Sequence, residues 1–144
     1  YNELIGLLIQ HDFNINICIL GVDEELSLCN DVCNNYNDSS NIYMLCGKTS
    51  FDESLSIISN CSVFVSADSG MMHVASALNV KTISIFGPTS SNEISPYWND
   101  SVVLSKHLSC SPCYPDLIQG CGSPVCMSTV TPKNVFYEIK KILE

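Results

Sequence analysis

One short stretch of the sequence brings an acid, a hydroxyl, a glycine and an imidazole together after an apolar run. These residues are Asp68, Ser69, Gly70 and His73, and a helix is predicted from Ser69. Ser69 can cap that helix, and Gly70 lets a ligand approach the backbone closely. The N–H groups of residues 70–72, at the helix start, have no partner inside the helix. The stretch therefore predicts an anion-binding site that needs no cationic side chain.

The same residue types also have ordinary structural roles. An isolated Asp-Ser-Gly is most often a capped turn, and a single histidine is most often a structural hydrogen-bonding group. Because a carboxylate repels a diphosphate, we expect Asp68 to accept hydrogen bonds from sugar hydroxyls or to fix the turn. A metal bridge through Asp68 has no second acid nearby in sequence to support it. His73 is expected to donate to a phosphate oxygen or to the turn itself.

The composition limits the partners that the chain can bind. Its 144 residues carry a net charge of −9, and all six cationic residues are lysines. Nucleic acids and anionic membrane surfaces need a cationic face, so neither is an expected partner.

No apolar run approaches the ~20 residues that span a bilayer. The start, YNELIGLLIQ, has no basic leader and begins within a predicted helix, so we expect no signal peptide and a piece of a longer protein.

Strands and helices alternate along the chain, which predicts an α/β fold with a Rossmann-like parallel sheet and helices on both faces. A single domain over residues 1–144 is predicted, with an irregular loop at 92–100, a Cys-rich loop at 106–128 and a C-terminal helix at 131–144. Strands are expected at residues 17–22, 42–45, 62–67, 82–87 and 102–105, and the other helices at 2–12, 23–36, from 50, and at 69–78.

Polar clusters follow the predicted strands. Ligands of parallel sheets bind past the carboxyl ends of the strands, so residues from different loops meet there. This convergence argues for a binding site more strongly than any one cluster does. The clusters are Gly21–Glu25, Gly47–Ser50, Asp68–His73 and Gly87–Ser90.

The order of these motifs resembles a known family over most of the chain. The run DSGMMHVASALNVKTISIFGPT resembles the signature of glycosyltransferase family 9, the ADP-heptose:lipopolysaccharide heptosyltransferases, which reads D-[ST]-G-x-x-H-x-A-x-A-L, then an apolar strand, then F-G-P-T. The stretches LGVDEE, CGKTSFDESLSIISNCSVFVSAD and CSPCYPDLIQGCGSPVCM resemble three further parts of the family's sequences.

The resemblance implies the C-terminal half of a GT-B glycosyltransferase, which is Rossmann-like and binds an ADP-sugar donor. By this resemblance, Asp68, Ser69 and Gly70 would contact the diphosphate and the donor sugar. Met71 and His73 would line the same pocket.

Four further positions have roles by the same resemblance. Glu24, or Glu25 if the turn shifts by one residue, would hold the ribose hydroxyls. Thr49 would contact adenine through backbone atoms. Gly87 and Thr89 would line the rim of the pocket.

The resemblance also implies an activity that this chain does not carry alone. The intact enzyme would transfer heptose to the lipopolysaccharide core with inversion and without a cofactor. Its general base would lie in an N-terminal domain that this chain lacks. The chain would also lack the first strand of this half, so this piece alone is expected to be inactive. That domain would bind the lipid-linked saccharide acceptor. A cytoplasmic protein, peripheral at the inner face of the inner membrane, is implied.

Two other functions stay open beside this one. A GT-B donor domain could use a different nucleotide sugar, such as a UDP- or GDP-sugar, and the turn at residues 46–50 would decide this. A non-catalytic module that binds a nucleotide or a nucleotide sugar is the second.

Four of the nine cysteines gather in the predicted loop at 106–128. Their number suits a tetrahedral structural zinc site, although the C-x4-C half is less typical than the C-x2-C half. Disulfides and reduced thiols packed in the loop are the alternatives. The other five cysteines are scattered and suggest small core residues in a reducing compartment. The candidate zinc ligands are Cys110, Cys113, Cys121 and Cys126.

Overall fold

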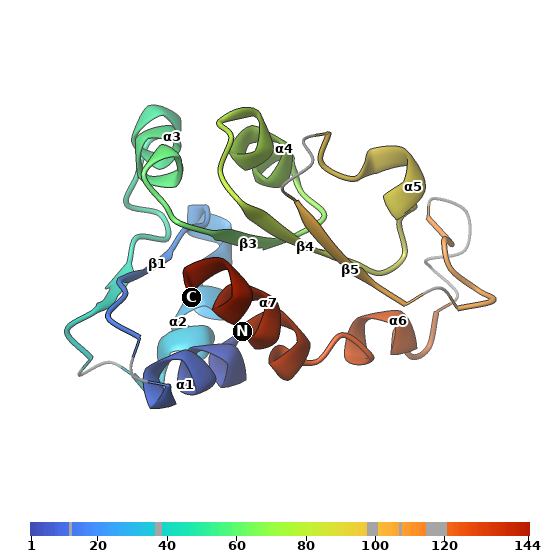
Figure 1. Ribbon diagram of the computed structural model, residues 1–144, viewed down its shortest axis with the longest axis horizontal. Helices are drawn as coiled ribbons and strands as arrows, with labels where there is room; N and C mark the ends of the chain where they lie inside the picture. The colour runs from blue at the N-terminus through green and yellow to red at the C-terminus, as the bar shows by residue number, and fades with distance from the viewer. Residues whose placement is uncertain (12, 37–38, 98–100, 107, 115–120) are drawn as a thin grey trace. The chain divides into compact units, whose positions relative to one another are not determined.

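A computed structural model describes residues 1–144 except 12, 37–38, 98–100, 107 and 115–120 (Figure 1). The chain divides into two compact units, Tyr1–Ser56 and Ile57–Glu144, and each unit is described by itself. A single domain over the whole chain stays a prediction.

The first unit holds a small parallel sheet and its helices. β1 (Ile17–Ile19) pairs in parallel with β2 (Ile42–Met44). α1 (Asn2–Gln10) precedes β1, and between the strands a 3₁₀ turn, η1 (Asp23–Glu25), leads into α2 (Leu26–Cys33). The order strand, helix, parallel strand confirms the predicted βαβ pattern, because a parallel pair needs such a crossover.

α1 and α2 are joined by hydrogen bonds as well as by apolar packing. The Nδ2 of Asn2 donates to the carbonyl of Val32 (2.8 Å), and the hydroxyl of Tyr36 donates to the carbonyl of Asn2 (3.2 Å). The side chains that they bury are apolar or thiol: Leu4, Ile5, Leu8, Cys29 and Cys33.

A capping box begins α3 (Phe51–Ser59), as the sequence predicts. The backbone N–H of Ser50 donates to Oε2 of Glu53 (2.7 Å), and the N–H of Glu53 donates to Oγ of Ser50 (3.3 Å). These hydrogen bonds stabilise the charged carboxylate, so they lower the pKa of Glu53, with the backbone N–H of Ser50 as the largest cause.

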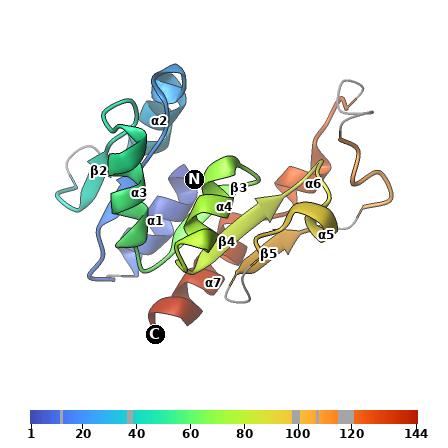
Figure 2. The same cartoon turned by 90° about the horizontal axis from the view of Figure 1, so that it is seen from above.

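The second unit is built on a three-stranded parallel sheet. Its strands are β3 (Phe64–Ala67), β4 (Thr82–Phe86) and β5 (Val102–Ser105), and they pair in the order β3-β4-β5 (Figure 2). α4 (Gly70–Ala77) connects β3 to β4, and α7 (Pro132–Leu143) ends the chain. Thr131 caps α7 by accepting the N–H of Asn134 (3.3 Å), which confirms its predicted start.

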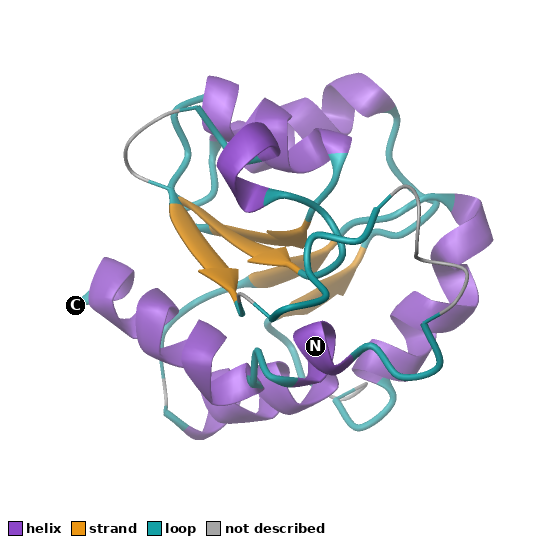
Figure 3. Cartoon of the chain, turned by 90° about the vertical axis from the view of Figure 1, so that its right-hand side faces the viewer, coloured by secondary structure: helices purple, strands orange, loops and turns teal. Residues whose placement is uncertain are grey.

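Helices cover both faces of this sheet. α4 packs against β3 and β4 on one face, and α7 packs against β4 and β5 on the other, as Figures 1 and 3 show. β4 is the most buried strand because it has a partner on each side and a helix over each face. The fully buried side chains of the sheet and α4 are Met72, Ala75, Thr82, Ile83, Ser84 and Phe86.

The structure corrects three predicted features. Hydrogen bonding joins the strands into two sheets, one in each unit, where the sequence predicts one; alternation predicts strand direction but not which strands pair. The loop predicted at 92–100 is not wholly irregular, because α5 (Ser91–Ile94) extends into it. The loop at 106–128 ends in α6 (Val125–Ser128). Residues 98–100, 107 and 115–120 of these loops lie outside the described residues.

Within the described part of the chain, none of the helices combines the length and the hydropathy that crossing a bilayer requires.

Candidate functional site

The predicted polar turns of the second unit lie at one edge of its sheet. Ala67, the last residue of β3, is level with Ile85 of β4, and the N–H of Asp68 donates to the carbonyl of Ile85 (3.2 Å). Gly87 begins the loop after β4. Because the two strands are parallel neighbours, the structure brings the Asp68 turn and the Gly87 turn to the same carboxyl edge.

The start of α4 is open beside Gly70. Ser69 occupies the N-cap position with extended backbone, but its side chain accepts no capping hydrogen bond. A Cβ atom added to Gly70 would meet no atom within 4 Å, so the space beside this residue is open. Ser69, Gly70 and His73 are exposed, and Asp68 and Met71 are partly buried.

One predicted donor at this helix start is already used. The N–H of Met72 donates to the carbonyl of Ser69 (3.2 Å), and the Met72 side chain is fully buried. The expectation of three N–H groups without partners at residues 70–72 is therefore wrong for Met72. Within the described residues no hydrogen bond is recorded for the N–H groups of Gly70 and Met71, so these two can bind an anion.

Ser66 is a residue of this site that the sequence does not reveal. Its Oγ lies 2.7 Å from the carbonyl oxygen of Ala67, to which it donates, and 2.9 Å from Oγ of Ser69. A serine in a predicted strand has no local signal that distinguishes it from any other strand residue, so only the fold shows this contact.

Thr89 has a buried hydroxyl at the second turn. Within the described residues its Oγ1 has no hydrogen-bond partner. A buried polar atom in this condition is uncommon, and a bound water or ligand would satisfy it. The place of Thr89 at the rim of a pocket stays a prediction.

The Cys-rich loop is bonded to the same turn. Oγ of Ser111 donates to the carbonyl of Gly87 (2.6 Å), and the N–H groups of Cys113 and Tyr114 donate to the carbonyl of Pro88 (2.8 and 2.9 Å). A Cβ atom on Gly87 would collide with the side chain of Met127 and lie 3.4 Å from Sγ of Cys126. The absence of a side chain at Gly87 therefore lets the end of the loop pack directly against the turn.

The four clustered cysteines lie near one another but carry no disulfide. The pKa of the Cys113 thiol is raised, first by loss of solvation and then by the charges of Cys121, Cys126 and Cys110. Within the described residues, no group of three or more His, Cys, Asp or Glu side chains is arranged to hold a metal ion. Zinc binding by this loop stays a prediction.

In the first unit, the turn after β1 separates the roles of two neighbouring acids. Oε2 of Glu25 accepts the N–H of Val22 (3.2 Å), so this carboxylate closes the turn. Glu24 is exposed. Of the two candidates for the ribose hydroxyls, Glu24 is the one whose carboxylate is not already used by Val22.

Thiols fill the space beneath this turn. A Cβ atom on Gly21 would lie 2.9 Å from Sγ of Cys46 and 3.2 Å from Sγ of Cys29. The pKa of Cys29 is raised to about 12. Burial is the largest cause, the hydrogen bond and charge of Cys46 come next, and the charges of Glu25 and Cys33 follow. Cys29 is therefore a protonated thiol at neutral pH, which suits a packing role and not a nucleophilic one.

Thr49 lies between β2 and α3 with its hydroxyl already paired. Its Oγ1 is 2.9 Å from Oγ of Ser54. The hydroxyl is therefore paired within the protein, and the contact of adenine with the Thr49 backbone, which the resemblance implies, stays a prediction. The adjacent Lys48 donates from Nζ to the carbonyl of Met44 (3.0 Å).

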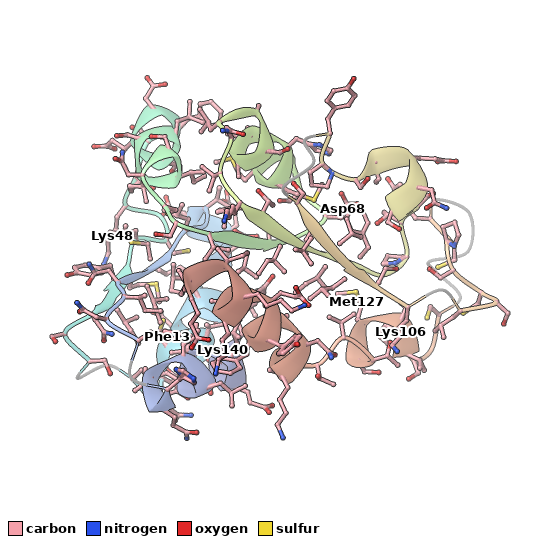
Figure 4. The ribbon with its side chains drawn as sticks, in the orientation of Figure 1. Phe13, Lys48, Asp68, Lys106, Met127 and Lys140 are labelled. Atoms are coloured by element: carbon pink, nitrogen blue, oxygen red, sulfur yellow. The ribbon has the colours of Figure 1, made fainter. Side chains whose placement is uncertain are left out.

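A cavity of about 240 Å³ in the second unit is separate from these turns. Lys106, which follows β5, lies on its wall, and Figure 4 labels both Lys106 and Asp68. None of the predicted site residues lines this cavity. Its lining residues are Leu104, Ser105, Lys106, Thr129, Val130, Asn134, Tyr137 and Glu138.

The predicted site residues thus fall into two groups. Asp68, Ser69, Gly70, Met71, His73, Gly87 and Thr89 belong to the second unit, and those that follow β3 and β4 share one sheet edge. Glu24 and Thr49 belong to the first unit, where each follows a strand of the β1–β2 sheet.

Comparisons with known proteins agree on one family. Its sequence profile, "Glycosyltransferase family 9 (heptosyltransferase)", matches residues 1–117. A lipooligosaccharide heptosyltransferase 2 from Campylobacter jejuni is 33% identical over 131 residues, which cover 88% of this chain and 40% of that protein.

Solved structures show the same relationship. The structure of E. coli ADP-heptose lps heptosyltransferase II is 26% identical, with a TM-score of 0.81 over 99% of this chain and 40% of that chain. E. coli heptosyltransferase WaaC with ADP is 23% identical, with a TM-score of 0.72 over 98% of this chain and 38% of that chain, and shares the fold. The chain spans about 40% of the length of these relatives. The signature DSGMMHVASAL begins at the carboxyl edge of a parallel sheet, and the family profile covers most of the chain. This chain therefore belongs to glycosyltransferase family 9 (heptosyltransferase).

Proposed function

We propose that this chain is the donor-binding part of an enzyme that transfers heptose from an ADP-heptose-like nucleotide sugar to the lipopolysaccharide core. The observation that carries the proposal is the start of α4, where the N–H groups of Gly70 and Met71 have no partner among the described residues and the space beside Gly70 is open. The relatives support the choice of donor, because one of them is a structure with ADP and another is named for ADP-heptose.

The turns after β3 and β4 bind the diphosphate and the donor sugar in this proposal. The N–H groups of Gly70 and Met71 bind the diphosphate, whose negative charge the helix dipole favours. Asp68 accepts hydrogen bonds from donor sugar hydroxyls, and exposed His73 donates to a phosphate oxygen. Gly87 and Thr89 line the rim, and the buried Oγ1 of Thr89 gains a partner when a ligand binds.

Two further contacts, both with the nucleoside, are part of the proposal. Glu24 binds the ribose hydroxyls, because a carboxylate accepts from both at once. Backbone atoms of Thr49 contact adenine.

The reaction that follows is an inverting displacement at the sugar. A base from a part of the protein outside this chain deprotonates the acceptor hydroxyl, which attacks the sugar carbon while the bond to the diphosphate breaks. The leaving diphosphate gains negative charge, and the N–H groups at the start of α4 stabilise it. The acceptor is a lipid-linked saccharide, and the enzyme works at the inner face of the inner membrane.

Asp68→Ala in the full-length protein tests this function. The variant is expected to fold, with an unchanged circular dichroism spectrum, but to lose about 100-fold or more in kcat/KM because a hydroxyl-binding group is gone. Full activity would contradict the role of Asp68. Asp52→Ala, which changes an exposed acid in α3, is the matched control and should leave kcat/KM unchanged.

Nucleotide competition separates the alternative functions. ADP, UDP and GDP are titrated against the protein, and NMR signals of residues 69–73 are followed. A response to ADP alone supports an ADP-sugar donor, whereas preference for UDP or GDP supports another nucleotide sugar. No response to any of them at millimolar concentration would remove the donor site. Nucleotide binding by the full-length protein without any sugar transfer would support a non-catalytic module.

We propose that the transfer itself needs no metal cofactor, since helix N–H groups can meet the charge of the diphosphate. Activity measured in excess EDTA is expected to equal activity without it. Loss of activity that Mg²⁺ restores would contradict this.

A further inference from the structure

Ser66 and Ser69 form a hydrogen-bonded pair whose proton positions can be worked out. Oγ of Ser66 lies 2.7 Å from the carbonyl oxygen of Ala67 and 2.9 Å from Oγ of Ser69. A carbonyl oxygen only accepts, and a serine hydroxyl has one proton, so the proton of Ser66 is used on Ala67. Ser69 must then be the donor to Ser66.

This pairing explains why Ser69 does not cap α4. A serine at the N-cap ordinarily accepts an N–H of the second or third helical residue, and this interaction is among the commonest at helix starts. Here the Ser69 side chain makes no capping hydrogen bond, and its hydroxyl lies against Ser66 instead. The carbonyl of Ser69, and not its hydroxyl, accepts the N–H of Met72.

We propose that Ser66 is a positioning residue that holds the Ser69 hydroxyl away from the helix start, so that the N–H groups of Gly70 and Met71 stay available to the diphosphate of a nucleotide. This inference rests on the proposed function of the turn. Ser66 does not touch the ligand; it acts through Ser69. Without it, the Ser69 hydroxyl can rotate and accept the N–H of Met71, the second helical residue, which the ligand needs.

A double-mutant cycle in the full-length protein tests the proposal. ADP affinity is measured by calorimetry for the wild type, Ser66→Ala, Ser69→Ala and the double variant. Ser66→Ala is expected to weaken ADP binding by roughly fivefold, since a capping interaction of about 1 kcal/mol now competes with the ligand. When Ser66→Ala is added to Ser69→Ala it should have no effect, because no hydroxyl remains to cap the helix.

Two controls keep a folding defect apart from a positioning role. Ser66→Thr retains the hydroxyl on a β-branched side chain that strands accept, and it should bind ADP like the wild type. Ser84→Ala changes the residue level with Ser66 on β4, whose buried hydroxyl has no partner in the described residues, and it should also leave ADP affinity unchanged. The melting temperature of Ser66→Ala should equal or exceed that of the wild type, because α4 gains a cap.

The outcomes separate this inference from the function on which it rests. If the wild type does not bind ADP, the proposed function fails. If the wild type binds ADP and Ser66→Ala binds equally well, only the role of Ser66 is overturned. The same holds if Ser66→Ala weakens binding equally with and without the Ser69→Ala substitution.

Discussion

At the residue scale, backbone geometry and single carboxylates determine how the turns of the first unit are built. Gly47, which follows β2, has a φ of +68°, a conformation that residues with a Cβ rarely adopt. A Cβ atom there would also collide with the Asp23 side chain. The turn that is predicted to face the nucleotide base therefore depends on a glycine for both its conformation and its space.

Gly47→Ala is expected to lower the free energy of unfolding by about 1–2 kcal/mol, because alanine pays the cost of a left-handed backbone. Urea denaturation measures it. Gly122→Ala is the matched control, since a Cβ atom on Gly122 would meet nothing within 4 Å, and its stability should stay within about 0.5 kcal/mol of the wild type. Equal stability of the two variants would contradict the strain argument.

Glu53 predicts a pH dependence at the start of α3. Its pKa is lowered from 4.5 in the folded protein, so its stabilising effect is present above that value and is lost as the pH falls through the lower folded pKa. Glu53→Gln should be less stable than the wild type at neutral pH, and the difference should shrink as the pH falls below 4.5 and through the lower folded pKa. Denaturation of both proteins across this range measures it; a difference that grows in acid would contradict the prediction.

At the element scale, the loop after β5 fixes the turn after β4. Ser111, Cys113 and Tyr114 bond to the carbonyls of Gly87 and Pro88, so three donors from one loop hold two successive residues of the predicted rim. Residues far apart in sequence thus shape one side of the site.

Ser111→Ala should weaken this contact. The carbonyl of Gly87 loses its partner at 2.6 Å, which is expected to cost about 1 kcal/mol and to weaken ADP binding a fewfold. Thermal unfolding and calorimetry measure the two effects. Ser128→Ala removes a hydroxyl that bonds, among the described residues, to Val125 of its own helix α6, and it should leave ADP binding unchanged. If both variants bind alike, the loop does not support the site.

Metal analysis of the freshly purified protein tests the zinc prediction for the Cys-rich loop. One zinc per chain, lost in Cys113→Ser but kept in Cys18→Ser, would support a tetrathiolate site. Cys18 lies in β1 of the first unit, so it is the matched control. A metal-free protein whose mass is lower by about 2 Da for each cysteine pair would show disulfides instead.

At the scale of the whole molecule, the chain accounts for about 40% of its relatives' length. A protein made of residues 1–144 alone is therefore expected to bind ADP weakly and to transfer no sugar, since the proposed base lies elsewhere. A transferase assay beside the full-length protein measures this. Measurable turnover by residues 1–144 would place the base within this chain.

Much of this arrangement can be read from local patterns. Apolar runs that alternate with helical periods predicted a parallel α/β fold, and the strand at 102–105 and the capping of α3 and α7 are confirmed. The start of α4 is also predicted well, because Asp-Ser-Gly after a buried strand is a local signal. The small helices α5 and α6 were missed, since each is a single turn without an apolar period.

The sequence by itself determined the fold class, the family and the turns on which chemistry could occur, because periodicity and motif order are carried by neighbours along the chain. Only the tertiary structure decided how the side chains in those turns are used. Ser69 bonds to Ser66 and does not cap α4, and Glu25 accepts the N–H of Val22 and closes its own turn. A hydroxyl or a carboxylate has several partners of similar strength within reach, and the folded geometry selects among them.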